Sequence, residues 1–427
     1  MNIGIIIGRI GGVDGVALET EKWIDVLQYL GHKVFIISGQ FQERTINREL
    51  ETLVPEMSFF SPESYWSQKK AFFFPETNPD ELIEHIGFYS DIICNKIIKW
   101  INNRKINIVI SENASALPAH LEMGFGIKKA AEKTSIPIIT HDHDFAWERG
   151  ERYISSHKQI NKFVADVFPL MLPNSFHAVI NSNAQATLKE KFNRNSVVIP
   201  NVMNFNIKFG ETNEYNKLVK YHLGLNSKDI LLFQITRIVR RKGIEVAIEL
   251  IHKLSDKRMK LIITGSHADD EGSMYYNELI EQINKLKLQG QIIFASHIIH
   301  NKGLQGVSGN SFSLSDAYAN AIACTYFSTY EGFGNAFIES ILSKTPIFVN
   351  NYKPVYMPDI GSKGFKTVML ENNELNNKAV NDIKEILLNE NLNKEIAEYN
   401  FELGKKYFSY KTLEEKFITL FENINKS

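Results

Sequence analysis

The feature of this sequence that most constrains its fold is a regular alternation of short apolar runs with amphipathic segments along almost the whole chain. Apolar runs at 2–9, 32–39 and 106–111 have the length of strands, and the segment 16–31 repeats apolar residues at helical spacing. Further strand-like runs occupy 136–141, 178–182, 230–237, 259–265, 291–296, 321–329 and 345–351. Parallel sheets that are covered by helices on both faces produce this pattern.

A polar stretch at 210–217 divides the alternation into two series. The sequence therefore predicts an α/β protein with two doubly wound, Rossmann-like domains, at 1–205 and 206–405, followed by a terminal segment at 406–427. Open parallel sheets bind ligands at the carboxyl ends of their strands. We therefore expect the functional site in a cleft between two facing sheets.

Composition excludes several classes of protein. The 427 residues carry a net charge of -1, so nothing draws the whole chain to nucleic acid, and any anion site must be local. The two cysteines, Cys94 and Cys324, lie in apolar stretches and predict neither a disulfide framework nor a cysteine metal site. Without a signal peptide or a membrane-spanning stretch, we expect a cytoplasmic protein, with peripheral contact to the inner membrane face as an open alternative.

A glycine-rich loop, "GRIGGVDG", follows the first strand. A nicotinamide site would need glycine where Ile10 stands and a carboxylate at the end of the second strand, where the chain reads Ser38-Gly39-Gln40. Hydride transfer is therefore disfavoured. Gly11, Gly12 and Gly15 either let the backbone approach a ligand or only form a tight turn.

The stretch "THDHDFAWERGERY" places His141, Asp142, His143 and Asp144 at the carboxyl end of a strand. Alternate residues of an extended segment share a face, so only every second side chain can converge on one ligand. A metal site is one interpretation, and helix capping is another. We favour hydrogen bonding to a polar ligand by one imidazole that Asp144 or Glu148 orients, and we expect no metal.

A basic turn opens the second domain. Arg237 follows a strand, and Lys242 and Gly243 directly precede a helix, whose N-terminal amides carry partial positive charge. This arrangement suits a diphosphate, although a surface turn is the alternative. Arg240 and Arg241 are expected to be solvated.

Two glutamates stand eight residues apart in "YEGFGNAFIES". Gly332 and Gly334 permit close backbone approach, and the helix that begins near Asn335 offers free amides. Glu331 would meet one part of a ligand. Glu339, on an otherwise apolar helix face, needs hydrogen-bond donors such as the hydroxyls of a ribose. The pair suits a ligand with hydroxyls at both ends and phosphate between them.

That ligand is a nucleotide sugar, and the chain resembles the retaining, GT-B-fold glycosyltransferases of family GT4, also called group 1. The resemblance rests on "GGVDG", "VIPNVMNF", "TRIVRRKG", "SLSDAYANA", "FSTYEGFGNAFIES" with its two spaced glutamates, and the terminal "YFSYKTLEEKFITLFENI". It covers nearly the whole chain. It implies an N-terminal acceptor domain, a C-terminal donor domain and a last helix that packs back on the first domain.

The resemblance also implies residue roles in the donor domain. Glu339 resembles the ribose-binding glutamate, and Glu331 the catalytic residue that faces the donor sugar. Arg237 and Lys242 resemble the catalytic pair that binds the diphosphate and stabilises it as the leaving group. Gly334 and Asn335 resemble the residues whose amides also bind the donor, through its sugar hydroxyls and phosphate.

In the first domain, Gly12 resembles the loop glycine that approaches the donor. A catalytic histidine near the reacting sugar is implied, and we favour His143 over His141. His141 and Asp144 are then further contacts to the acceptor or the donor sugar. The segments 112–118 and 141–149 resemble a subgroup associated with mannosyl transfer to small glycosyl acceptors.

The implied reaction is metal-independent hexosyl transfer, with retention, from a UDP- or GDP-sugar to a sugar, glycan or glycolipid, and it uses no cofactor. The alternatives are an epimerase or phosphorylase on the same fold, or a non-catalytic binding protein. The aromatic stretch 55–75 contains Lys69 and Lys70. It could line an acceptor pocket or touch lipid, or Phe72 to Phe74 could simply be core.

Overall fold

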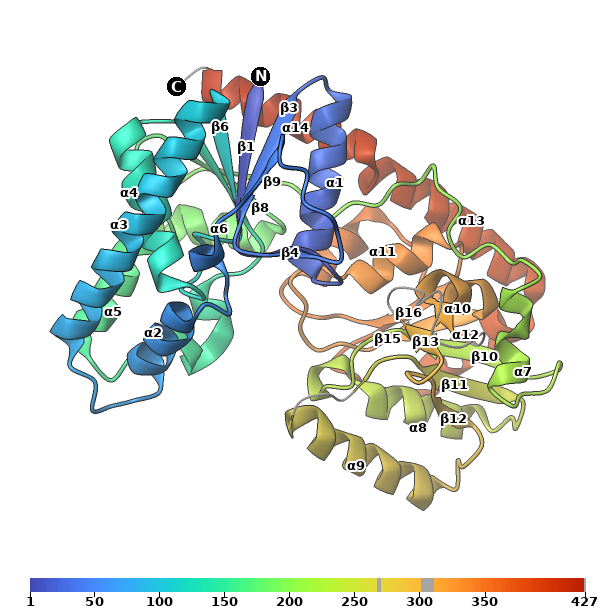
Figure 1. The fold of residues 1–427 in the computed structure, drawn as a ribbon. Helices are drawn as coiled ribbons and strands as arrows, with labels where there is room; N and C mark the ends of the chain where they lie inside the picture. The colour runs from blue at the N-terminus through green and yellow to red at the C-terminus, as the bar shows by residue number, and fades with distance from the viewer. Residues whose placement is uncertain (267–269, 301–310, 426–427) are drawn as a thin grey trace. The chain divides into compact units, whose positions relative to one another are not determined.

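The computed structural model describes residues 1–266, 270–300 and 311–425, which form two compact units (Figure 1). Unit 1 comprises Met1–Asn201 and Leu413–Ser427, and unit 2 comprises Val202–Thr412. The sequence placed the corresponding boundaries after residues 205 and 405. Each unit is an α/β structure with a sheet of its own, as the alternating pattern predicted.

The centre of unit 1 is a parallel sheet of seven strands in the order β5-β3-β1-β6-β7-β8-β9. Ile5, Ile6 and Ile7 are at most 2% exposed although successive side chains point to opposite faces, so both faces of β1 are covered. The strands are β1 (Asn2–Ile7), β3 (Lys33–Ser38), β5 (Glu51–Leu53), β6 (Ile108–Glu112), β7 (Ile138–Asp142), β8 (Ser175–Val179) and β9 (Ser196–Val198), and a short parallel pair is formed by β2 (Ile10–Gly11) and β4 (Phe41–Gln42).

Seven α-helices belong to unit 1 within the described residues: α1 (Gly15–Tyr29), α2 (Pro62–Phe72), α3 (Pro79–Arg104), α4 (Leu121–Thr134), α5 (Lys158–Val167), α6 (Ser182–Phe192) and α14 (Tyr410–Asn425). The strand expected over 178–182 ends earlier, at Val179. The reason is local, since the Asn181 side chain accepts a hydrogen bond from the Ala184 amide at 2.8 Å and so starts α6.

The C-terminal helix α14 is part of unit 1 from Leu413 onward. Leu413, Phe417 and Leu420 are at most 1% exposed, and the Phe417 ring meets the Trp23 indole edge-on at a centroid distance of 4.8 Å. Their spacing of three and four residues forms one apolar stripe. The last helix therefore supports α1 from a position almost 400 residues away in the sequence.

Unit 2 is built on a parallel sheet in the order β12-β11-β10-β15-β16-β17. In α8, Ile244, Ala247, Ile248 and Ile251 are 0% exposed and repeat at helical spacing. The strands are β10 (Ile230–Gln234), β11 (Met259–Ile263), β12 (Ile292–Phe294), β15 (Ala323–Tyr326), β16 (Ile347–Asn350) and β17 (Met369–Leu370), with a separate pair β13 (Ile299–His300) and β14 (Phe312–Ser313). The helices are α7 (Val219–His222), α8 (Ile244–Leu254), α9 (Asp270–Leu286), α10 (Leu314–Asn320), α11 (Asn335–Leu342), α12 (Asn377–Leu388) and α13 (Glu390–Tyr407).

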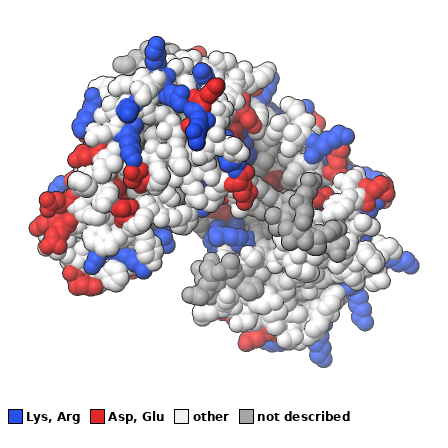
Figure 2. All heavy atoms as spheres, in the orientation of Figure 1, with Lys and Arg blue, Asp and Glu red and all other residues white. Residues whose placement is uncertain are grey.

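Acidic and basic side chains are interspersed on the face of the molecule shown in Figure 2, in keeping with the net charge of -1. In the part of the chain that the structure describes, none of the helices has both the length and the apolarity needed to cross a membrane.

Candidate functional site

Two loops meet at the carboxyl ends of β10 and β15 in unit 2. These strands are hydrogen-bonded neighbours, with Leu232 opposite Ala323. The Thr329 amide donates to the Arg241 carbonyl at 2.8 Å, and Arg241 Nη1 donates to the Tyr330 carbonyl at 2.9 Å. The basic turn at Arg240–Lys242 and the loop that carries Glu331 are thus held against each other.

A buried ion pair joins the two loops. Lys242 and Glu331 are each 8% exposed, and Lys242 Nζ donates to Glu331 Oε1. Arg241 Nη1 lies 3.0 Å from Glu331 Oε2. Burial lowers the pKa of Lys242, against the opposing charge of Glu331. Burial would raise the pKa of Glu331, but Lys242 and Arg241 outweigh it and hold that pKa below its usual value.

The expectation that Arg240 and Arg241 form a solvated pair is wrong for Arg241. Arg240 is exposed and pairs with both oxygens of Glu278, at 2.6 and 2.7 Å. Arg241 is half-buried and turns toward Glu331. The sequence could not separate them because both lie in one short turn, where side-chain direction depends on the loop packed against it.

Arg237 is exposed. Its positive charge also lowers the pKa of Lys242, although burial has the larger effect. The first amides of α8 have a partner that the sequence did not indicate. Ile244 and Glu245 donate to the Tyr275 hydroxyl at 3.0 and 3.3 Å. These two amides therefore do not face a ligand, and the positive charge at this site comes from side chains.

Glycine is required at two positions of these loops. Gly243 has φ +61°, and a side chain there would meet the Phe327 carbonyl oxygen at 2.2 Å. Gly334 has φ +124°, and its substituent would lie 2.4 Å from Tyr352 Oη. Since Gly334 has no side chain to cap α11, this helix begins at Asn335 without a side-chain cap.

Glu339, the second glutamate, lies half-buried on α11 and accepts a hydrogen bond from the Tyr318 hydroxyl at 3.1 Å. Burial and the neighbouring Glu339 charge raise the pKa of Tyr318 well above its ordinary value, so the phenol keeps its proton and remains a donor. One of the hydrogen-bond donors that a carboxylate in this apolar helix needs is thus supplied by the protein itself.

In unit 1, the glycine loop packs against β4. Gly12 has φ +70°, and a side chain there would lie 2.6 Å from Gln42 Oε1. Asp14 caps α1 by accepting from the Val16 and Ala17 amides at 3.0 and 3.2 Å. The left-handed backbone conformation by itself therefore favours glycine at position 12.

The residues at the carboxyl end of β7 divide between two faces, as the extended-chain alternation predicted. On one face, His141 Nδ1 and Glu112 Oε2 share a hydrogen bond of 2.8 Å, and the His143 ring lies 4.3 Å from the His141 ring. On the other face, the Thr140 hydroxyl donates to Asp142 Oδ2 at 2.7 Å. His141 is 0% exposed and stacks on Trp23 at 3.8 Å, whereas the His143 side chain is 9% exposed.

Burial neutralises this histidine cluster. It lowers the pKa of His141 to about 3 and that of His143 to about 3, and it raises the pKa of Glu112 to about 8. One ligand atom from each of Glu112, His141 and His143 lies within 4.8 Å of the others, a spacing that could hold a metal ion. Asp142, on the other face, has its pKa raised to about 7 by burial.

Asp144 and Glu148, which were expected to orient an imidazole, contact other groups. Asp144 accepts from Asn113 Nδ2 at 2.9 Å and pairs with Arg149, and Glu148 accepts from the Phe145 amide at 2.8 Å. The carboxyl group that contacts both rings is Glu112, whose Oε2 is 3.9 Å from His143 Nε2.

Known proteins with similar sequences settle the family. The profile described as "Glycosyl transferases group 1" matches residues 219–403. A mannosylglucosylglycerate synthase from Petrotoga mobilis is 31% identical over 388 residues, which are 87% of this chain and 86% of that protein. The chain belongs to the group 1 glycosyltransferases. A mannosylglucosylglycerate synthase from Thermotoga maritima is 29% identical to this glycosyltransferase over 97% of this chain and 98% of its own.

Solved structures agree on the fold of this glycosyltransferase. A glycosyltransferase from Rickettsia africae superimposes with a TM-score of 0.70 at 18% identity, covering 100% of this chain and 99% of that one. Anabaena HepE in complex with UDP-glucose gives a TM-score of 0.64 at 14% identity, with 100% of both chains covered. The architecture is GT-B, as the sequence motifs predicted.

Three residues of this glycosyltransferase escaped the sequence analysis: Arg241, Tyr318 and Glu112. Tyr318 lies in "SLSDAYANA", which was recognised only as a motif. Glu112 ends β6 and pairs in register with His141 on the neighbouring strand. The sequence did contain a signal for Glu112: this carboxylate ends one central strand, and the histidines end another.

Proposed function

We propose that this glycosyltransferase transfers a mannosyl group, with retention at the anomeric carbon, from a UDP- or GDP-linked donor to a hydroxyl of a small acidic glycoside. The observation that carries the proposal is the cationic set of Arg237, Arg241 and Lys242 around buried Glu331 at the carboxyl ends of β10 and β15. The mannosylglucosylglycerate synthases similar to this chain support the sugar and the acceptor class.

In unit 2, Arg237 and Lys242 bind the diphosphate, while Glu339 accepts hydrogen bonds from the ribose and Glu331 faces the donor sugar. The bond between the anomeric carbon and the diphosphate oxygen breaks as an acceptor oxygen attacks from the same face. The acceptor proton leaves with the diphosphate. Fixed cations stabilise the negative charge that develops on the leaving phosphate, and they need no reorganisation as it forms.

Two further contacts in unit 2 would come from Gly334 and Asn335, whose amides lie at the start of α11. Gly334 has no side chain that would separate the backbone from a phosphate or sugar oxygen.

In unit 1, His143 is the histidine that contacts the reacting sugar. His141 is fully buried against Trp23 and Glu112, so its role is to position His143 through their ring contact. Asp144 holds the same turn through Asn113, whose Oδ1 accepts from the His143 amide at 3.1 Å. Gly12 keeps the first loop free of a side chain next to the donor.

The transfer proceeds without a divalent metal, because protein cations perform the role that a metal ion has in many other transferases. Excess EDTA is therefore expected to leave the rate unchanged. A fall in rate that Mn²⁺ or Zn²⁺ reverses would contradict this and would point to the ligand set at Glu112, His141 and His143.

A thermal-shift screen with UDP, GDP, ADP and their mannose and glucose conjugates tests the donor site. A ligand that binds only the native state raises the melting temperature. One diphosphate is expected to stabilise the wild type but not Lys242→Ala or Glu339→Ala, while Lys257→Ala, which removes an exposed lysine of unit 2, responds normally.

Product analysis then tests the reaction. Donor and glucosylglycerate are incubated with the enzyme, and the anomeric configuration of the product is read by NMR. An inverted linkage, donor conversion without acceptor, or absence of any diphosphate response in the wild type would each contradict the proposal.

A further inference from the structure

A pocket in unit 1 that shares no lining residue with the histidine cluster lies beside α2 and the short helical segment Ala146–Tyr153. Its volume is about 590 Å³, which suits a small-molecule ligand. Most of its wall is aromatic, formed by Phe59, Phe60, Tyr65, Phe73, Phe74 and Tyr153. The charged residues of its lining are Lys69 and Arg152, and no carboxylate lines it.

Both cations are available to a ligand. Lys69 Nζ lies 4.4 Å from the centre of the Tyr65 ring, and Arg152 Cζ lies 5.5 Å from that of Tyr153. Neither forms an ion pair with a carboxylate in the described part of the chain, in contrast to Arg149, which pairs with Asp144. The pocket therefore presents uncompensated positive charge, which favours an anion.

Three aromatic residues of the pocket are more than half exposed. Phe60 is 69% exposed, Tyr65 59% and Phe73 58%, whereas neighbouring Phe72 is partly buried and packs against the core. Clustered exposed rings mark a binding surface. Flat ring faces suit the apolar C–H faces of a sugar, so these residues and the cations together match a sugar that carries an acid.

The walls of the pocket are held by hydrogen bonds. Gln68 Nε2 donates to the Pro118 carbonyl at 2.5 Å, and the Thr77 hydroxyl donates to the Lys70 carbonyl at 2.8 Å. A ring nitrogen of His157 bonds to the Pro75 carbonyl at 2.8 Å. These bonds hold α2 and the chain that follows it, so the part of the wall that contains Lys69 and Phe73 would lose little chain entropy when a ligand binds.

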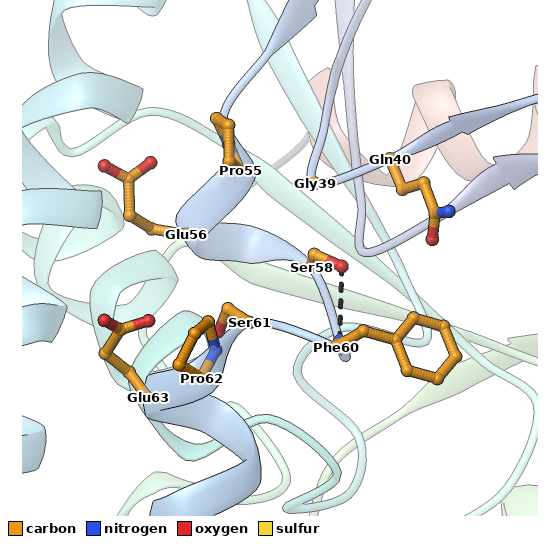
Figure 3. Close-up of a pocket in the computed structure, with 9 residues that line it drawn as sticks. All are labelled: Gly39, Gln40, Pro55, Glu56, Ser58, Phe60, Ser61, Pro62 and Glu63. Atoms are coloured by element: carbon orange, nitrogen blue, oxygen red, sulfur yellow. Dashed lines mark hydrogen bonds between the residues drawn. The ribbon is translucent and has the colours of Figure 1, made fainter.

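The adjoining pocket differs in charge. It has a volume of about 520 Å³, shares Phe60 and is lined by Glu56 and Glu63, which lie on the same side in Figure 3. Carboxylates repel an acid but accept hydrogen bonds from hydroxyl groups. Because Lys96 pairs with Glu56, the difference in charge between the two pockets rests on Glu63.

We propose that the pocket at Lys69 and Arg152 is the acceptor-specificity site of this enzyme, where the two cations hold the carboxylate of a glycoside acid and the aromatic wall holds its sugar ring. This inference rests on the proposed function, and it adds the residues that select a charged acceptor over a neutral one. Arginine and lysine form charge-assisted hydrogen bonds to carboxylates.

Titration calorimetry tests the site with two probes, glucosylglycerate and its neutral analogue glucosylglycerol. The wild type is expected to bind the acid at least tenfold more tightly. Lys69→Gln and Arg152→Gln should each weaken binding of the acid about tenfold and that of the neutral probe less than twofold. Lys158→Gln, which removes an exposed lysine outside the pocket, should change neither.

Phe73→Ala provides the complementary variant, because it should weaken both probes by similar factors. All substituted side chains are exposed, so melting temperatures close to that of the wild type will show that the variants fold. Any one of three results would overturn the inference. Binding of the acid could be unchanged in both cation variants, the wild type could bind the two probes equally, or it could fail to bind glucosylglycerate.

A transfer assay separates this inference from the proposed function. If the wild type binds glucosylglycerate through Lys69 and Arg152 but transfers no sugar to it from any donor, the site stands and the function is wrong. If transfer occurs and KM for glucosylglycerate is the same in both variants, the function stands and the site is wrong.

Discussion

The two units each bury a small set of titratable side chains, and the two sets differ in charge. In unit 2, Lys242 and Glu331 are paired, and the pKa of Glu331 stays below its usual value. In unit 1, His141 and His143 have pKa values near 3 and Glu112 one near 8, so burial removes their charges at neutral pH. Burial acts on both sets, but in unit 2 the charges of Lys242 and Arg241 offset it at Glu331.

The difference matches two tasks in sugar transfer. In the proposed reaction Lys242 would exchange its partner Glu331 for a phosphate, a contact that needs a charged group. A neutral imidazole can donate or accept a hydrogen bond, which suits contact with a sugar hydroxyl. The predictions below test whether charge is needed in one unit and neutrality in the other.

The largest effect is expected from Lys242→Met. Loss of the central cation should reduce kcat about 10²–10³-fold. It should also destabilise unit 2 by about 3–5 kcal/mol, because Glu331 remains buried with less compensation. Steady-state kinetics and differential scanning calorimetry measure the two effects.

The double variant Lys242→Met, Glu331→Gln is the control for that experiment. It should recover most of the stability but none of the activity. Recovery of activity as well would show that Lys242 serves only to neutralise Glu331, and the leaving-group role would then be wrong.

The next effect concerns His143→Ala, which removes a neutral hydrogen-bonding group from unit 1. We expect kcat to fall about 10–100-fold while the affinity for the nucleoside diphosphate stays unchanged. His252→Ala, which removes an exposed histidine of unit 2, should keep full kcat. A loss of diphosphate affinity in His143→Ala would contradict the assignment of the nucleotide to unit 2.

Because Glu112 is uncharged in the folded protein at neutral pH, the free energy of unfolding of unit 1 should depend on pH. Between about pH 6.5 and 8 the folded protein keeps the Glu112 proton, while an unfolded chain with the ordinary pKa of 4.5 has lost it. The native state then binds more protons, so stability falls as pH rises, by about 2 kcal/mol over this window. Asp142, with a pKa of about 7, adds a smaller fall of the same sign in the lower half.

The histidines oppose this fall in the lower half of the window, because each has an ordinary pKa of 6.5 in the unfolded chain and is partly protonated there, while in the folded protein it is not; each offsets roughly 0.4 kcal/mol. Other charges near the cluster are Glu19, Asp14 and Asp144.

Glu112→Gln should flatten the decline of stability with rising pH, whereas Glu190→Gln, at an exposed site, should not. All four tryptophans lie in unit 1, so urea unfolding followed by tryptophan fluorescence reports on this unit.

The smallest effect is expected from Tyr318→Phe. It removes one hydrogen bond to Glu339 and should weaken diphosphate binding about fivefold, with little change in kcat. Tyr221→Phe, at an exposed tyrosine of unit 2, is the matched control. An equal loss with a diphosphate that carries no ribose would show that Tyr318 does not act through the ribose contact.

Much of the architecture follows from the sequence itself. Strands that are buried on both faces must be apolar along their length, and helices that cover them must be apolar on one side, so the alternation alone predicts two α/β units. The same logic places Lys242 and Glu331 after strands, where parallel sheets bind ligands. Their contact spans 89 residues of sequence and depends on β10 and β15 being neighbours in the sheet.

Tertiary structure alone decided the finer chemistry. The register of β6 against β7 sets Glu112 beside His141, and the loop after β15 turns Arg241 toward Glu331. Tyr275 reaches the start of α8 from another helix and occupies amides that the sequence left open. Periodicity reports which face of an element is buried, but not which side chain lies opposite. Partners, and with them charge and pKa, are fixed only when separate elements pack together.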